Sequence, residues 1–159
     1  MTRSKILQAY KASVTAAYKE LALKINNLKK NDLDKMAFDK AVRAAAGRCG
    51  ALCSAAIKRA SRDHLIALLL EHKGKGLDVT PTVAQHVCDR VLGRGVDTRK
   101  TLEAFATPGR TAADKSTLGA ADLVEIEQAL GAQVGTIRDA AQVIKGECVT
   151  AYKAGKYDK

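Results

Sequence analysis

The sequence predicts an all-α protein, a helical bundle of about six to seven helices, and three observations favour this class. Alanine and leucine, the best apolar helix formers, account for 28 and 16 of the 159 residues. Only two prolines interrupt the chain, and aromatic residues make up 4% of it. A sandwich or barrel would need more β-branched and aromatic residues at alternating positions. The length fits one domain, residues 1–159.

The first predicted helix covers residues 3–29. Apolar side chains from Leu7 to Leu28 recur there at steps of three and four residues, which places them on one face. Lys5 and Lys19 fall on the opposite face, and Lys11 lies at its border. This helix is therefore expected to be apolar on one side and basic on the other.

The second helical region follows a break around Asn31, and either Asp32 or Asp34 can cap it. Small side chains dominate residues 44–60, which favours a helix packed closely against its neighbours. Residues 65–70 are apolar all round, so we expect them to form the central buried helix.

Two loops, residues 74–78 and 93–97, share the pattern glycine, basic, glycine, aliphatic, aspartate. A glycine C-cap followed by the N-cap of the next helix explains this pattern. Helices are predicted from Pro81 to Leu92 and over 98–106, followed by a turn at 107–109. Two last helices, about 117–131 and 134–152, are expected to divide at Gly131.

The net charge of +10 is distributed unevenly. Residues 1–75 hold 16 basic and 6 acidic side chains, whereas residues 76–159 hold 11 of each. A basic half of this kind indicates a polyanionic partner, most often nucleic acid. No apolar run approaches the ~20 residues of a membrane span, and no signal peptide is evident. We therefore expect a cytoplasmic protein that does not bind membranes.

Catalytic and metal chemistry find little support in the residues. The chain lacks the common nucleophile, phosphate-loop, zinc-protease and dinucleotide motifs, so we expect no enzyme, no small-molecule substrate and no cofactor. Four soft ligands, Cys49, Cys53, His86 and Cys88, would suit zinc. However, residues two apart on a helix point in different directions, and free cysteines are commonly buried. Reduced, metal-free thiols are the favoured interpretation, and Cys148 is included in it.

Residues 122–145 resemble a helix-turn-helix of the kind found in sigma factors. Gly131 occupies the position of the turn glycine, and Ile126, Leu130 and Val134 match the packing positions. The resemblance implies a DNA-binding regulator in which Arg138 is one of few cations on the recognition helix. An ordinary helical hairpin explains the same residues and is the favoured alternative.

A further resemblance covers residues 87–139, which are similar to rod-shaped, tobamovirus-like coat proteins. Residues 91–100 match the family's apolar-glycine segment followed by Asp97, Thr98 and Arg99, and Thr107-Pro108 follows in the family's order. The resemblance implies a helical bundle that polymerises around single-stranded RNA, with Arg99 against the RNA backbone. It would place the protein in a virion.

These patterns together predict a nucleic-acid-binding subunit of a multimeric nucleoprotein assembly, either a helical coat or the small subunit of an RNA-guided complex. We expect self-association and contact with the phosphate backbone, of RNA rather than DNA, without sequence specificity. The alternatives are the helix-turn-helix regulator and a structural helical bundle that binds no nucleic acid. The candidate nucleic-acid-binding residues are Lys5, Lys11, Lys19, Arg43, Arg48, Lys58, Arg59, Arg62, Arg94 and Arg99.

Overall fold

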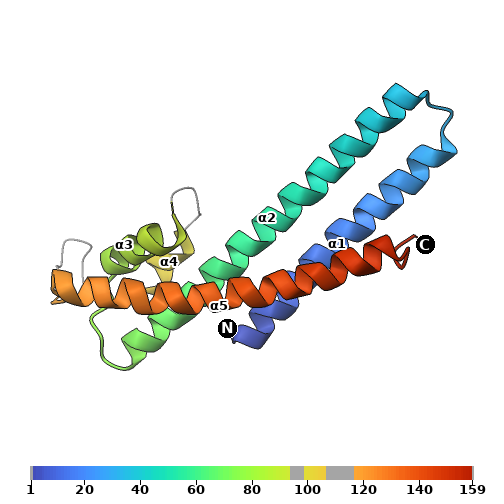
Figure 1. Ribbon diagram of the computed structural model, residues 1–159. Coiled ribbons are helices and arrows are strands. Elements are labelled where there is room, and N and C mark those ends of the chain that lie inside the picture. Colours follow the sequence, from blue (N-terminus) through green and yellow to red (C-terminus); the bar gives the residue numbers. More distant parts are fainter. Residues whose placement is uncertain (1, 94–98, 107–116, 159) are drawn as a thin grey trace. The chain divides into compact units, whose positions relative to one another are not determined.

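The computed structural model describes residues 2–93, 99–106 and 117–158, and these residues form helices without any strand (Figure 1). The helices are α1 (Arg3–Lys30), α2 (Lys35–Gly74), α3 (Pro81–Leu92), α4 (Arg99–Ala104) and α5 (Ala120–Lys153). The predicted all-α class is therefore confirmed for the described part of the chain. The described residues contain five helices, so the predicted number of six to seven is wrong.

The difference arises in α2 and α5, which run unbroken for 40 and 34 residues. Gly131, where a break was predicted, lies inside α5. Leu130 and Val134 on either side of it are completely buried. A glycine in a helix costs only about 1 kcal/mol relative to alanine. Burial of the flanking side chains offsets that cost, and the helix continues through the glycine.

Capping residues set several of the helix ends as the sequence predicts. The Asp34 carboxylate accepts a hydrogen bond from the backbone N–H of Ala37 at 2.8 Å, which identifies Asp34 rather than Asp32 as the cap of α2. Thr80 caps α3, with Pro81 as its first residue. Gly93 ends α3 with a φ of 85°, a conformation that favours glycine. The predicted turn at 107–109 lies outside the described residues.

The chain divides into two compact units, and α1, α2 and α5 each contribute residues to both. Unit 1 comprises residues 1–6 and 58–138, and unit 2 comprises 7–57 and 139–159. In unit 2, α1 packs with the first part of α2 and the last part of α5. Its buried side chains include Tyr10 and Val14.

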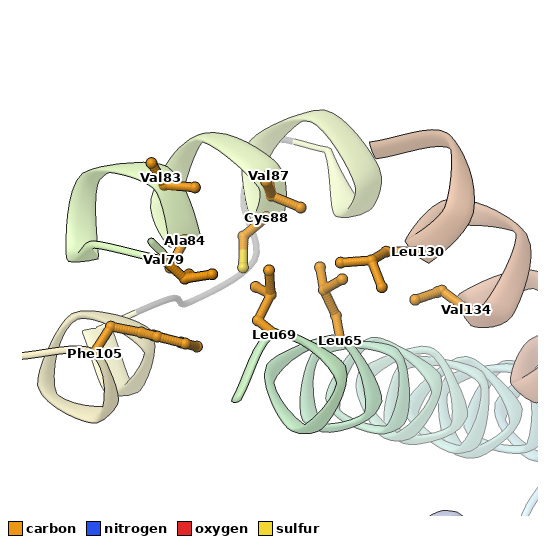
Figure 2. Packing of buried hydrophobic residues seen from close by; sticks show 10 residues of the cluster. All are labelled: Leu65, Leu69, Val79, Val83, Ala84, Val87, Cys88, Phe105, Leu130 and Val134. Atoms are coloured by element: carbon orange, nitrogen blue, oxygen red, sulfur yellow. The ribbon is translucent and has the colours of Figure 1, made fainter. Parts of the chain in front are cut away.

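The core of unit 1 gathers apolar side chains from α2, α3 and α5 together with Phe105, which follows α4 (Figure 2). Leu65 and Leu69 of α2 lie at its centre and are completely buried. The prediction that residues 65–70 are buried all round is only partly right, because Leu70 is 41% exposed. The face of α2 that carries Leu65 and Leu69 packs into the core, and Leu70 falls outside this face.

Candidate nucleic-acid interface

Helix α1 presents the basic face that its sequence predicts. Lys5, Lys11 and Lys19 are exposed, whereas Tyr10 and Val14 on the other side are buried. The Lys19 Nζ lies 5.9 Å from the centre of the Tyr157 ring, a weak cation–π contact at the surface. None of the three lysines forms an ion pair with a carboxylate of the described residues.

Helix α2 adds three more cations of the same kind. Arg43, Lys58 and Arg59 are exposed, and within the described ranges no carboxylate pairs with them. The Arg43 Nε donates only a long hydrogen bond of 3.4 Å to the backbone oxygen of Asp39 in the preceding turn. The charged groups of all three are therefore accessible to an anion in solution.

The other four candidates differ from these six. Arg48 donates a 2.7 Å hydrogen bond to the Glu20 carboxylate, so its charge is already balanced. The Arg62 side chain is only 14% exposed and pairs with Asp63. Arg94 lies outside the described residues. Arg99 begins α4, but its side chain is not among those the structure describes.

The six accessible cations are distributed over both units. Lys5, Lys58 and Arg59 belong to unit 1, and Lys11, Lys19 and Arg43 belong to unit 2. Each unit therefore has its own set of three.

Further exposed lysines, among them Lys24 of α1 and Lys40 of α2, are not among the candidates predicted from the sequence. The signal that could have found Lys40 is the absence of any acidic residue from residue 40 to residue 62, a stretch that holds six basic ones.

A hollow in unit 2 lies between α1 and α2, where both helices present small side chains. Its volume is about 400 Å³, and Ala17, Ala41 and Ala45 are among the residues that line it. Glu20 and Arg48 also line it and form the ion pair described above. This position explains why Arg48 is less suited to binding phosphate than its neighbours on α2.

The cysteines are buried free thiols, and three of them lie in unit 2. Burial, and secondarily the neighbouring Cys53, raises the pKa of the Cys49 thiol to about 11. The Cys148 Sγ lies 3.5 Å from the Thr15 hydroxyl. Across the described residues, no three histidine, cysteine or acidic side chains are grouped so that they could hold a metal ion.

The acidic residues near the start of α5 have structural contacts. The Asp122 carboxylate accepts a hydrogen bond from the backbone N–H of Gly119 at 3.3 Å, a capping contact. The Glu127 side chain is only 15% exposed. It lies 2.8 Å from the His86 Nε2 and 3.7 Å from the Arg90 Nε, and so links α5 to α3.

The helix-turn-helix expected from residues 122–145 is wrong, because those residues form part of the single helix α5 and Gly131 makes no turn. Arg138 does not extend freely from a recognition helix either. Its Nε donates a 3.1 Å hydrogen bond to the Ser61 hydroxyl of α2. The favoured helical hairpin is excluded by the same continuity.

No helix in the described part of the chain is long and apolar enough to span a membrane. Comparisons with protein-family models, with curated proteins and with solved structures found no match to this chain.

Proposed function

We propose that this protein is a nucleic-acid-binding α-helical subunit of a multimeric nucleoprotein assembly. It contacts the phosphate backbone without reading the base sequence. The observation that carries the proposal is the set of exposed cations without carboxylate partners on α1 and α2, which are Lys5, Lys11, Lys19, Arg43, Lys58 and Arg59. Exposed, uncompensated lysines and arginines neutralise phosphates and release the counterions bound to them.

The surface around the cations of α2 supports contact with a backbone. Between Arg43 and Lys58 the exposed positions other than Arg48 carry small side chains, among them Gly47, Ala51 and Ser54. Small side chains do not hold a polyanion away from the helix, so the long cationic side chains reach the phosphates on either side of it.

The scarcity of aromatic residues argues against recognition by base stacking. The chain has no tryptophan, two phenylalanines and four tyrosines. Of these, Phe105 and Tyr10 are buried in the two cores. Proteins that bind single strands through their bases use exposed aromatic platforms, which are worth about 1–3 kcal/mol per base. Backbone contact is the mode that remains for this surface.

Assembly into multimers is the second part of the proposal. It follows from the resemblance of residues 87–139 to rod-shaped virus coat proteins, whose subunits polymerise around RNA. Two large apolar side chains next to the turn between α1 and α2 support it, since Leu33 is 41% and Met36 84% exposed. RNA is the expected nucleic acid, in a virion or as part of an RNA-guided complex.

The test compares two variants by fluorescence anisotropy with single-stranded RNA, single-stranded DNA and duplex DNA of mixed sequence. The first variant replaces Lys11, Lys19 and Arg43 by glutamine. The control removes three other cations from the same unit, Lys35, Lys145 and Lys153, which are not among the candidate residues. The two variants have the same net charge, so any difference between them depends on the position of the cations.

We expect the first variant to bind every sequence more weakly and the control to remain close to wild type. If six phosphates are neutralised, affinity for duplex DNA falls on the order of 10³-fold between 50 and 200 mM salt. Removal of three cations halves the dependence of log affinity on log salt concentration, so the loss of affinity over the same salt range falls to about 40-fold. Equal effects of the two variants would contradict the proposed surface. No binding at low salt would leave a structural helical bundle as the function.

Size-exclusion chromatography with light scattering, with and without RNA, tests the assembly. The proposal requires particles that contain more than one protein chain when RNA is present. A strictly monomeric complex would remove the multimeric part of the proposal and leave the binding part intact.

A further inference from the structure

A group of hydrogen-bond donors converges in unit 1 from three helices. Arg138 of α5 donates a 3.1 Å hydrogen bond from its Nε to the Ser61 hydroxyl of α2. Arg3, the first residue of α1, donates from its Nη2 to the backbone oxygen of Thr136 at 3.4 Å. Thr136 and Arg138 are two residues apart on α5, so Arg3 contacts the turn of α5 that carries Arg138.

His64 completes the group. It follows Ser61 by three residues on α2, which places it on the same face one turn further along. It is 8% exposed, and its imidazole has no hydrogen-bond partner among the described residues. Among the described residues, no fully buried side-chain nitrogen or oxygen lacks a hydrogen-bond partner. The unpartnered imidazole nitrogens therefore reach the surface, where a ligand can meet them.

The group carries positive charge without compensation. No described carboxylate pairs with Arg3 or Arg138. Asp63, the acidic residue beside His64 on α2, is engaged by Arg62. Burial and the charge of Arg3 both lower the pKa of His64, so its imidazole is neutral at pH 7 and offers one N–H. Two guanidinium groups and a neutral imidazole are thus accessible to an acceptor.

We propose that Arg3, Ser61, His64 and Arg138 form a binding site for a phosphate monoester, such as the terminal phosphate of a nucleic-acid strand. Planar guanidinium groups match the oxygens of a phosphate, and two of them balance the charge of about −1.5 to −2 that a monoester carries at pH 7. A diester within the strand carries one charge and is flanked by sugars on both sides. A site with two cations suits the end of a strand better.

The identification of the ligand as a strand terminus rests on the proposed function, whereas the site itself does not. The experiment measures binding of two RNA oligonucleotides of identical sequence, one with a 5′-phosphate and one with a 5′-hydroxyl. Inorganic phosphate and a nucleoside 5′-monophosphate are titrated separately at constant ionic strength. Wild type is compared with Arg3→Gln, Arg138→Gln and a control, Lys153→Gln, which removes a cation of α5 in the other unit.

Wild type and the Lys153→Gln control should bind the 5′-phosphorylated RNA about tenfold more tightly than the 5′-hydroxyl RNA, a gain typical of a charge-assisted contact. Arg3→Gln and Arg138→Gln should lose this preference while retaining the affinity for 5′-hydroxyl RNA to within about threefold, as expected for loss of one phosphate contact. Because Arg3 is exposed and bonds only to a backbone oxygen, Arg3→Gln should fold normally even if Arg138→Gln does not.

The outcomes separate the two proposals. Equal binding of the two RNAs by wild type, together with no response to inorganic phosphate or the mononucleotide, overturns this site and leaves the backbone surface on α1 and α2 intact. If neither RNA binds but the mononucleotide binds to wild type and not to Arg3→Gln, the site is supported and the proposed function fails. A preference for the 5′-phosphate that survives in Arg3→Gln and Arg138→Gln overturns the assignment of these residues.

Discussion

Replacement of Gly131 by alanine tests the continuity of α5, because a continuous helix and a turn at Gly131 predict opposite changes in the free energy of unfolding. In a turn between two helices, Gly131 would need a conformation that alanine adopts only with strain. In the structure it lies inside a helix, it is not among the glycines with positive φ, and a Cβ added to it would meet nothing within 4 Å. Gly131→Ala should therefore stabilise the protein.

The magnitude follows from helix propensity alone, because the added methyl group makes no new contact. Alanine is more favourable than glycine in a helix interior by about 0.8–1.0 kcal/mol. Gly135, one turn further along α5, has the same open surroundings. The double variant should therefore gain about 2 kcal/mol, which raises Tm by roughly 4–8 °C for a chain of this length.

The assay is urea denaturation followed by circular dichroism at 222 nm, with the m-value compared between variants. The matched control is Gly93→Ala, in which the glycine has a φ of 85° and the substitution should cost about 1–3 kcal/mol. A loss of stability in Gly131→Ala similar to that in Gly93→Ala would refute the continuous helix. It would restore the turn that the sequence suggested.

Three further predictions concern the first turn of α3, the core of unit 1 and the thiols of unit 2. Thr80→Ala should lower the free energy of unfolding by about 1 kcal/mol, because the Thr80 Oγ1 accepts a hydrogen bond from the backbone N–H of Val83 at 3.2 Å. Thr80→Ser should restore most of this stability, and equal unfolding midpoints for all three proteins would contradict the cap. Leu69→Ala should lower the free energy of unfolding by about 2–5 kcal/mol in the same denaturation assay, since Leu69 is completely buried. A loss below about 1 kcal/mol would mean that Leu69 does not contribute to the core as described. The free energy of unfolding should fall as pH rises from about 9 through about 11, because the unfolded state ionises its cysteines before the folded state ionises Cys49, whose pKa is raised to about 11. Cys49→Ala should reduce this pH dependence. An unchanged profile would show that the pKa of the Cys49 thiol is no higher in the folded protein than in the unfolded one.

Much of the local structure could be predicted because its causes lie within a few residues of one another. The three- and four-residue steps in α1 are enough to separate its buried face from its lysines. The Thr80-Pro81 pair fixes the start of α3, since threonine satisfies a free N–H and proline has none to satisfy. The exposure of Lys5, Lys11 and Lys19 follows from the same periodicity.

The features that could not be predicted depend on residues far apart in the chain. Whether Gly131 breaks a helix depends on what Leu130 and Val134 pack against, and the core they join includes side chains of α2 and α3, far from them in the sequence. The pairing of Arg48 with Glu20, which leaves Arg48 less suited to bind phosphate than its neighbours, is of the same kind, because the two residues meet across the packed helices α1 and α2.

The sequence by itself determined the helical class, the caps and the basic character of the first half of this protein, because helix propensity, capping and charge are properties of single residues and their near neighbours. Only the tertiary structure decided which cations remain accessible and which are engaged. It also brought Arg3, Ser61, His64 and Arg138 together from α1, α2 and α5. Convergence of this kind is set by how the cores pack, and no local pattern encodes it.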